Sequence, residues 1–291
     1  MCASVNVSGH GLSEPLPELL LGELEDLAVA AARAAGQFIV HERPRGLGVV
    51  GTKSSITDVV TVMDQQSEAL LRAHLLGARP DDAILGEEDG ASEGTSGITW
   101  VIDPIDGTVN YLYQIPAYCV SVAAVIGDPG TPGQWKPVAG AVCNPLTAAV
   151  YHARVGGGAY VLRDEQDTAI EVNPVDVLLE SLVATGFGYR AEVRARQGEV
   201  LAAILPEIRD IRRAGSAALD LCAVACGTVD AYYESGLNPW DLAAGWLIAT
   251  EAGALVSGLN HVAPGEAAVV AAGPRVHGLL LSRLEALAPL R

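Results

Sequence analysis

The pattern of apolar and polar positions divides the chain into a helical start and a sheet-rich remainder. Over residues 17–41, apolar residues recur every three or four positions, which is typical of an amphipathic helix. Thr61 and Asp64 have the spacing of a capping box, so a second helix is expected to begin there. Short apolar runs at 47–50 and 83–86 predict strands on either side of that helix.

The middle and the last part of the chain differ in periodicity. Short apolar runs separated by Gly and Pro predict a mostly antiparallel sheet, with strands at 118–126, 138–142, 148–152, 159–162 and 169–172. Strand and helix patterns then alternate, with strands expected at 181–185, 208–212, 229–233, 254–256 and 267–272, and helices at 191–204, 216–226, 240–252 and from 274. Such alternation is typical of helices layered against sheets. We therefore expect two fused αβ lobes that share a cleft.

Two acids follow directly on an apolar run near the middle of the chain. Residues 98–102 predict a buried strand, and Asp103 and Asp106 come next. An Asx turn before an ordinary helix cap would explain one aspartate, but it does not explain two. Paired carboxylates beside unpaired backbone N–H groups at the start of a helix suit a phosphate and a divalent cation.

The residues between and after these acids predict a sharp corner. We expect Pro104 to end the strand, because it has no N–H to donate to a neighbouring strand. Gly107 suits a tight turn, and Thr108 has the character of a helix N-cap.

Two further acids have a similar setting. Glu87 follows the strand expected at 83–86, and Asp241 opens a helix behind Pro239. Taken singly, the first has the character of a solvated loop acid and the second of an acid stabilised by the helix dipole. Together with the pair at the corner they form an all-oxygen ligand set, without His or Cys, which suits Mg²⁺, Mn²⁺ or Ca²⁺. Two such ions beside one phosphate would support phosphoester hydrolysis by water.

Composition and charge narrow the classes of partner. The chain has 291 residues, 50% of them hydrophobic, with 18 Lys and Arg against 35 Asp and Glu and a net charge of −17. We expect no binding of nucleic acid or of a membrane, and we expect a phosphorylated substrate to need cations that reverse the local sign. Without a membrane-spanning or signal pattern, a cytoplasmic protein is expected. Residues 1–16 predict a flexible tail, and residues 17–291 a single catalytic domain.

Three motifs together resemble a known family. Gly86-Glu87-Glu88, the segment from Trp100 to Asn110, and Trp240-Asp241-Leu-Ala-Ala-Gly245 with Thr250-Glu-Ala-Gly253 are similar to those of the inositol monophosphatase family, bacterial SuhB type. The resemblance covers the chain from about residue 20 to its C-terminus. It implies the layered αβαβα sandwich of sugar phosphatases, Mg²⁺-dependent hydrolysis of a small phosphorylated polyol such as myo-inositol 1-phosphate, inhibition by Li⁺, and a homodimer.

The resemblance also implies roles for individual residues. Two or three Mg²⁺ ions would bind per site, the first on Glu87, Asp103 and the Ile105 carbonyl, the second on Asp103, Asp106 and Asp241, and a weaker third near Glu87. The Thr108 hydroxyl, paired with Asp64, would orient and deprotonate the attacking water, and Lys53 would lie near the metals. Residues implied in substrate binding are Ile105, Asp106, Gly107, Thr108, Gly215, Ser216, Ala217, Glu234 and Asp241. For Lys53 and Glu234, a solvated loop lysine and a strand-ending acid are alternatives.

Other interpretations stay open at this stage. Related phosphatases act on fructose-1,6-bisphosphate, histidinol phosphate or 3′-phosphoadenosine 5′-phosphate. Haloacid-dehalogenase phosphatases carry Asp-x-Asp-Gly-Thr, but here the two aspartates of Asp103-Pro-Ile-Asp106-Gly-Thr lie one residue further apart, which counts against that class. A regulatory protein that binds partners, such as the transcription machinery bound by some relatives, is the non-enzymatic alternative.

Overall fold

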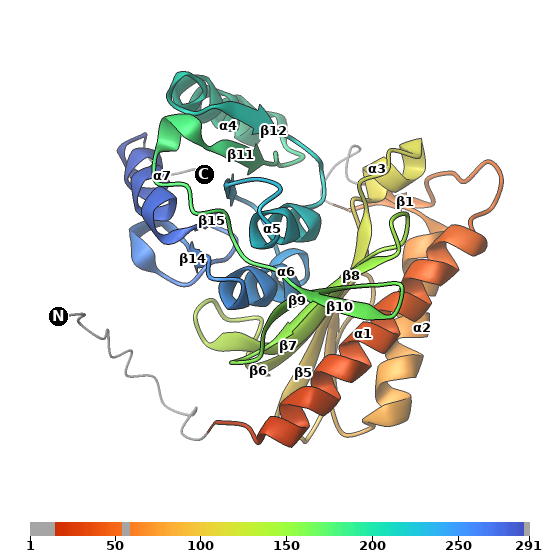
Figure 1. Ribbon diagram of the computed structural model, residues 1–291. Coiled ribbons are helices and arrows are strands. Elements are labelled where there is room, and N and C mark those ends of the chain that lie inside the picture. The colour runs from red at the N-terminus through yellow and green to blue at the C-terminus, as the bar shows by residue number, and fades with distance from the viewer. Residues whose placement is uncertain (1–14, 54–58, 288–291) are drawn as a thin grey trace.

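The computed structural model describes residues 15–53 and 59–287 (Figure 1). The helices are α1 (Glu18–His41), α2 (Val62–Ala78), α3 (Thr108–Tyr113), α4 (Ala191–Ile204), α5 (Ala217–Ala225), α6 (Pro239–Glu251) and α7 (Pro274–Ala286). The strands are β1 (Gly51–Thr52), β2 (Val59–Val60), β3 (Ala83–Gly86), β4 (Gly90–Ser92), β5 (Ile98–Asp106), β6 (Cys119–Gly127), β7 (Trp135–Asn144), β8 (Ala149–Arg154), β9 (Gly158–Arg163), β10 (Gln166–Ala169), β11 (Leu182–Thr185), β12 (Asp210–Arg212), β13 (Ala231–Glu234), β14 (Leu255–Ser257) and β15 (Val269–Ala272).

Two large sheets carry the fold. The eight-stranded sheet has the order β10-β9-β8-β7-β6-β5-β3-β4, and its strands pair antiparallel except for the parallel pair β3 and β5. The five-stranded sheet has the order β12-β11-β13-β15-β14, and β11 pairs in parallel with both β12 and β13. A short antiparallel pair, β1 and β2, lies outside both sheets. The sequence thus predicted the change from an antiparallel to an alternating region.

Helices and sheets stack as five layers. The first core lies between α1 and α2 and one face of the eight-stranded sheet, the second around α5 and α6 between the two sheets, and the third between the five-stranded sheet and α4 and α7. Figure 1 shows α1 and α2 on the outer face and α5 and α6 between the sheets. This is the αβαβα sandwich expected from the sequence.

The period-two pattern of β6 shows why the eight-stranded sheet is covered on both faces. Val120, Val122 and Ala124 pack into the core under α1 and α2, whereas Ala123 and Val125 pack toward α5 and α6. Both faces of the strand are therefore apolar, and the strand appears in the sequence as an uninterrupted apolar run.

Several sequence-based boundaries were wrong. The segment 47–50 is irregular, and pairing begins instead at β1. The strand expected at 169–172 lies earlier, as β10, because its polar residues pair with β9 at the exposed edge of the sheet. Strand β4 was not predicted, because its three residues, Gly90, Ala91 and Ser92, carry no apolar pattern.

Residues 1–14 of the predicted N-terminal tail lie outside the described residues, and the single catalytic domain over 17–291 stays a prediction. Within 15–53 and 59–287, no helix combines the length and the apolar character that crossing a membrane requires.

Candidate active site

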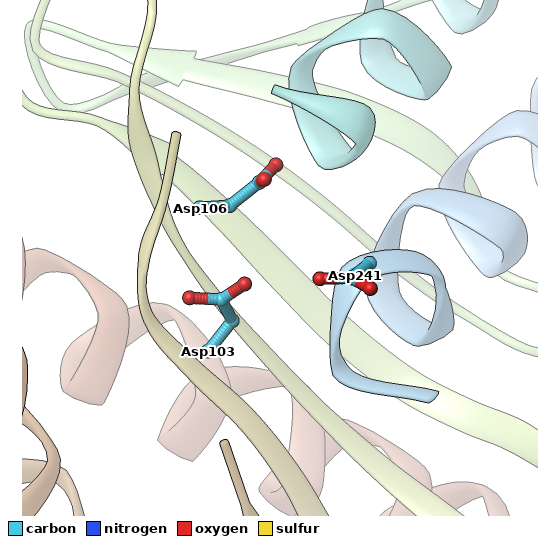
Figure 2. Close-up of side chains that lie close together, drawn as sticks. All are labelled: Asp103, Asp106 and Asp241. Carbon is cyan, nitrogen blue, oxygen red and sulfur yellow. The ribbon is translucent and has the colours of Figure 1, made fainter. Parts of the chain in front are cut away.

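Three carboxylates from two distant parts of the chain converge between the sheets. Asp103 and Asp106 lie at the end of β5, and Asp241 lies in the first turn of α6. One oxygen from each lies within 4.8 Å of the others, and Figure 2 shows the three side chains around a common space. This is the only cluster of at least three His, Cys, Asp or Glu side chains with such spacing in the part of the chain that the structure describes.

A bulge in β5 explains how Asp103 and Asp106 face the same side. Residues three positions apart on a regular strand point to opposite faces. Here Asp103 pairs with Ser121 and Asp106 with Cys119, so three steps on β5 match two on β6. The extra residue brings both carboxylates to one face. Pro104 lies within this bulge and does not end the strand, which corrects the sequence-based expectation, because a bulged position needs no ladder N–H.

Hydrogen bonds fix each of the three carboxylates. Asp106 Oδ2 accepts bonds from the Ser216 hydroxyl at 2.6 Å and from the Ala218 amide at 2.8 Å. Asp103 Oδ1 accepts a bond from the Ile105 amide at 2.9 Å. Asp241 Oδ2 accepts a bond from the amide of Asn238, which precedes α6, at 2.6 Å. Each group is held through one oxygen, and a carboxylate has a second oxygen that can face a cation.

The electrostatics of the cluster favour cations. Burial raises the pKa of Asp103 and Asp241 well above the usual range, and repulsion from Glu87 and Asp106 raises it further. Burial also raises the pKa of Asp106, although the bond from Ser216 opposes that shift. These negative charges lie close together in a poorly solvated place, so a divalent cation would offset their mutual repulsion. The all-oxygen donor set fits a hard cation such as Mg²⁺.

Glu87 lies beside this cluster rather than within it. It follows β3, its side chain is 17% exposed, and it forms an ion pair with Lys53 Nζ at 2.7 Å. Lys53 also pairs with Glu88 at 2.6 Å. Burial raises the pKa of Glu87 to about 7, although Lys53 opposes the shift. Burial lowers the pKa of Lys53, but the two glutamates outweigh this and raise it.

A buried glutamate that sequence reasoning missed shapes the loop of Glu87. Glu68, on α2, accepts hydrogen bonds from the amides of Glu88 and Asp89 at 2.8 and 3.0 Å. A Cβ on Gly86 would lie 2.2 Å from Glu68 Oε1, so only glycine allows this approach. The sequence pattern that could have indicated Glu68 is the presence of polar residues on the face of α2 that is buried.

Asp64 and Thr108 form the second polar unit. The Thr108 hydroxyl lies 3.1 Å from Asp64 Oδ1 and 3.1 Å from the Ile105 carbonyl oxygen, either of which can accept its proton. Asp64 is fully buried, and its other oxygen accepts a bond from the Thr61 amide at 2.8 Å. The capping box predicted for α2 is therefore present, and it positions Asp64.

The helix cap at the corner is Gly107 rather than Thr108. Gly107 has φ +94°, and Thr108 is the first residue of α3. A Cβ at Gly107 would lie 2.9 Å from the Ala117 carbonyl and 3.1 Å from that of Gly215. Both the positive φ and these close contacts therefore require glycine at this position. The hydroxyl of Thr108 is consequently free of capping and points toward Asp64.

A cleft of about 520 Å³ brings the predicted residues together. The predicted site residues that line it are Lys53, Glu87, Asp103, Ile105, Asp106, Gly107, Thr108, Gly215, Ser216, Ala217, Glu234 and Asp241. Asp64 does not line it and lies behind Thr108. Most of the remaining wall consists of the loops after β11, β12 and β13, which are parallel neighbours. Ligands bind at the carboxyl ends of such strands.

Residues in these loops were missed from the sequence. Phe187, Tyr189 and Arg213 line the cleft, as does Trp240. The first three belong to no acidic motif, so the search for metal ligands passed over them, and Trp240 was noted only as the residue before Asp241 in its motif. The alternation of strands and helices after residue 180 was the available signal, because it predicts which loops share an edge.

Glu234 is held in the cleft by its own strand. The Tyr232 hydroxyl, fully buried, donates to Glu234 Oε2 at 2.7 Å. A Cβ on Gly186 would lie 1.9 Å from that same oxygen, so the residue that follows β11 must be glycine. Burial raises the pKa of Glu234 to about 7. The strand-ending acid considered from the sequence is thus also a wall of the cleft.

Comparisons with known proteins agree with this geometry. The model of the inositol monophosphatase family matches residues 20–288. Inositol-1-monophosphatase SuhB of Mycobacterium tuberculosis is 45% identical over 92% of this chain and 94% of that protein. Nus factor SuhB of Vibrio cholerae is 35% identical over 86% of this chain and 91% of that protein. The solved structure of Mycobacterium tuberculosis SuhB aligns with a TM-score of 0.78 and 42% identity, over 93% of this chain and 98% of that one.

Proposed function

The chain belongs to the inositol monophosphatase family, a family of phosphatases, and we propose that it hydrolyses myo-inositol 1-phosphate and related small polyol monophosphates in the presence of Mg²⁺. One observation carries the proposal. Asp103, Asp106 and Asp241 converge at the floor of a cleft that is large enough for a small ligand. The name of the mycobacterial relative supports inositol 1-phosphate as the substrate.

The residues present fit two Mg²⁺ ions. Glu87, Asp103 and the Ile105 carbonyl would hold one, and Asp103, Asp106 and Asp241 would hold the other, with a third near Glu87. When bound, the ions supply charge to offset the phosphate and lower the pKa of an attacking water. Because Li⁺ is a small, hard cation, we expect it to compete at these oxygens and inhibit turnover.

The attacking water is positioned by Thr108 and Asp64. The Thr108 hydroxyl donates to Asp64, so its oxygen remains an acceptor for a proton of the water. Burial raises the pKa of Asp64, although the bonds from Thr61 and Thr108 oppose the shift, so this carboxylate is a better proton acceptor than one in water. Thr108 thereby passes a proton from the water toward Asp64.

The substrate binds across both walls of the cleft. The amides of Gly107 and Thr108, at the start of α3, would donate to the phosphate oxygens. Lys53 would contact the phosphate from the side of Glu87. The carboxylate of Glu234 and the segment at Gly215 would contact the polyol hydroxyls. A homodimer, and the lack of nucleic-acid binding, remain parts of the proposal.

Phosphate release tests the proposal. Inositol 1-phosphate, fructose-1,6-bisphosphate, histidinol phosphate and 3′-phosphoadenosine 5′-phosphate are assayed with and without Mg²⁺ and Li⁺. We expect inositol 1-phosphate to be hydrolysed fastest, only with Mg²⁺, and Li⁺ to inhibit. Preference for another substrate would correct the substrate alone. Unchanged turnover after removal of divalent cations would refute the mechanism.

A second role through protein partners is favoured by one observation, the name Nus factor given to the Vibrio cholerae relative. We propose that any such role is independent of hydrolysis. Asp106→Asn, which changes one buried carboxylate, should then lose turnover and still retain partners in a pull-down from the native host. Loss of both together would reject this independence.

A further inference from the structure

Helix α2 buries a row of polar side chains against the active site. Ser67 and Glu68 follow Asp64 by three and four positions, so the three residues share one face of the helix, and all are fully buried. Asp64 is the proton acceptor described above, and the Ser67 hydroxyl donates to the Pro104 carbonyl oxygen, in the bulge of β5, at 3.3 Å. Glu68 contacts a third part of the site, the loop that carries Glu87.

Both carboxylate oxygens of Glu68 accept hydrogen bonds from the loop between β3 and β4. Oε2 accepts a bond from the Glu88 amide at 2.8 Å, and Oε1 accepts one from the Asp89 amide at 3.0 Å. These amides belong to the two residues that follow Glu87. On the other side of Glu87, Gly86 ends β3 and is paired within the sheet. The backbone of Glu87 is therefore fixed on both sides.

Arg72, one turn further along α2, pairs with Glu68. Its Nε donates to Glu68 Oε1 at 2.9 Å, and its Nη2 lies 2.8 Å from the same oxygen. Nη2 also donates to the Gly90 carbonyl oxygen, at the start of β4, at 2.5 Å. A buried carboxylate needs such an ion pair and hydrogen bonds to offset its lost hydration. The pair thus holds the loop at both Glu88 and Gly90.

The register of the sheet shows why this loop matters for the carboxylates. Gly86 pairs with Ile102 on the parallel neighbour β5, so Glu87 and Asp103 each follow one member of this pair. Their like charges repel each other and would favour turning the side chain of Glu87 away. A fixed backbone limits that movement, and it lowers the entropy cost of ordering Glu87 around a cation.

We propose that Glu68 is a positioning residue which, with Arg72, holds the loop so that Glu87 and Asp103 can bind the same cation. This inference rests on the proposed function, in which these two carboxylates share an ion. Removing a group that orients a metal ligand typically weakens metal binding about 10–100-fold. Glu68 therefore sets the cation affinity on the Glu87 side of the site, whereas the ion on Asp106 and Asp241 does not depend on it.

Mn²⁺ titration of wild type and Glu68→Gln, followed by electron paramagnetic resonance, tests this role, and Glu87→Gln identifies the ion that Glu87 holds. Glutamine keeps the shape of Glu68 but replaces one acceptor oxygen by an NH₂ group, which cannot accept a bond from the loop amide or from Arg72. We expect the dissociation constant of the ion on Glu87 to rise at least about tenfold. That of the ion on Asp106 and Asp241 should change less than about twofold.

Turnover gives a second readout of the same role. For Glu68→Gln we expect the Mg²⁺ concentration for half-maximal rate to rise about tenfold, with kcat at saturating Mg²⁺ within about threefold of wild type. Unchanged Mn²⁺ binding by the folded variant would overturn the proposal.

Glu25→Gln is the matched control. Glu25 is also a buried helical glutamate, 5% exposed, and it pairs with Arg154 at 2.6 Å, but it lies on α1 and does not line the cleft. Both variants should lower Tm, and only Glu68→Gln should weaken Mn²⁺ binding. Equal weakening in the two variants would assign the effect to lost stability and overturn the proposal.

A second variant decides the question if Glu68→Gln does not fold. Arg72→Lys keeps a positive charge opposite Glu68 but loses the guanidinium fork that also reaches Gly90. We expect the ion on Glu87 to bind about threefold more weakly, and unchanged binding would overturn the proposal. If wild-type protein hydrolyses none of the four phosphates, the proposed function alone is refuted, because the Mn²⁺ titration does not depend on turnover.

Discussion

The two sheets contribute to the site in different ways. The eight-stranded sheet supplies Asp103 and Asp106, which are 1% and 8% exposed and lie within a strand paired on both sides. The five-stranded sheet supplies loops after its parallel strands, including Tyr189 and Arg213, and both of these residues are exposed. Rigid elements hold groups for chemistry, whereas loops adapt to different ligands. We infer that the first sheet fixes the reaction and the second selects the substrate.

We call the eight-stranded sheet with the corner after β5 the first region, and the five-stranded sheet with its loops and α6 the second region. Hydrogen bonds between these two regions connect them into one site. Asp106 receives bonds from Ser216 and Ala218, and Asn110 donates to the loop before α5. Each bond connects the corner after β5 with residues more than a hundred positions later. Changes on either side should therefore reach the carboxylates, but by different amounts.

The largest effect on kcat is expected at Asp241, the one carboxylate of the cluster that comes from the second region. Asp241→Asn keeps the shape of the side chain and its acceptor oxygen but removes one of the charges that would hold a cation. We expect kcat to fall about 1,000-fold, with an unchanged circular dichroism spectrum. Glu23→Gln, at an exposed position on α1, is the control and should keep wild-type turnover. Wild-type turnover of Asp241→Asn at low Mg²⁺ would refute the ligand assignment.

A smaller effect is expected from the proton path of the first region. Thr108→Ala removes the hydroxyl that lies 3.1 Å from Asp64 Oδ1 and leaves the three aspartates in place. We expect kcat to fall about 100-fold, with an unchanged Mg²⁺ concentration for half-maximal rate. Thr108→Ser should restore most of the rate. A shifted Mg²⁺ dependence would instead make Thr108 a part of the metal site.

Substitution of two glycines tests how much the corner between the regions contributes to the free energy of unfolding. Gly107→Ala imposes φ +94° on a residue with a Cβ and places that Cβ 2.9 Å from the Ala117 carbonyl oxygen. Gly46→Ala imposes φ +74° with no atom within 4 Å of the new Cβ. By chemical denaturation we expect Gly46→Ala to cost about 1 kcal/mol and Gly107→Ala about 2–3 kcal/mol. Equal costs would show that the close approach does not matter.

The smallest effect concerns the attachment of α1 to the first sheet. His152 lies between Glu25 at 2.7 Å and Asp167 at 3.0 Å. Burial lowers the pKa of His152, but the bonds to these two acids outweigh it and raise the pKa above its ordinary value of 6.5. Burial raises the pKa of Glu25, but the bonds from His152 and Arg154 outweigh it and lower the pKa below its ordinary value of 4.5.

The direction of the pH dependence follows from these shifts. The contribution of His152 to stability is complete below pH 6.5 and is lost as pH rises through its folded pKa, while that of Glu25 is present above pH 4.5 and is lost as pH falls through its folded pKa. The Tm of wild-type protein minus that of His152→Gln should therefore be larger at pH 5.5 than at pH 8.5. A difference independent of pH would contradict the charged pairing.

The layers of the fold and the carboxylates of the site could both be predicted from the sequence, because both depend on local patterns. Apolar runs, alternating elements and acids that follow strands are local patterns, and Asp103, Asp106, Glu87 and Asp241 could each be found from them. Their convergence depends on which strands pair, and that information entered only through the family resemblance.

What the sequence did not predict depends on contacts between distant residues. The bulge in β5 exists because the strand stays paired with β6 beyond Pro104, and proline alone indicated an end. The cap at Gly107 needs the nearby carbonyls of Ala117 and Gly215 to be understood. Arg213 lies in a loop without a motif, and only the shared edge of parallel strands brings it to the cleft.

Binding of Mn²⁺, followed by electron paramagnetic resonance, tests the central claim that both regions hold the same cations. The protein is titrated as wild type, as Asp103→Asn from the first region and as Asp241→Asn from the second. We predict at least two bound Mn²⁺ per chain in wild type and the loss of at least one in each variant. Full wild-type binding by Asp241→Asn would mean that the first region holds its metals alone, and it would contradict the shared site.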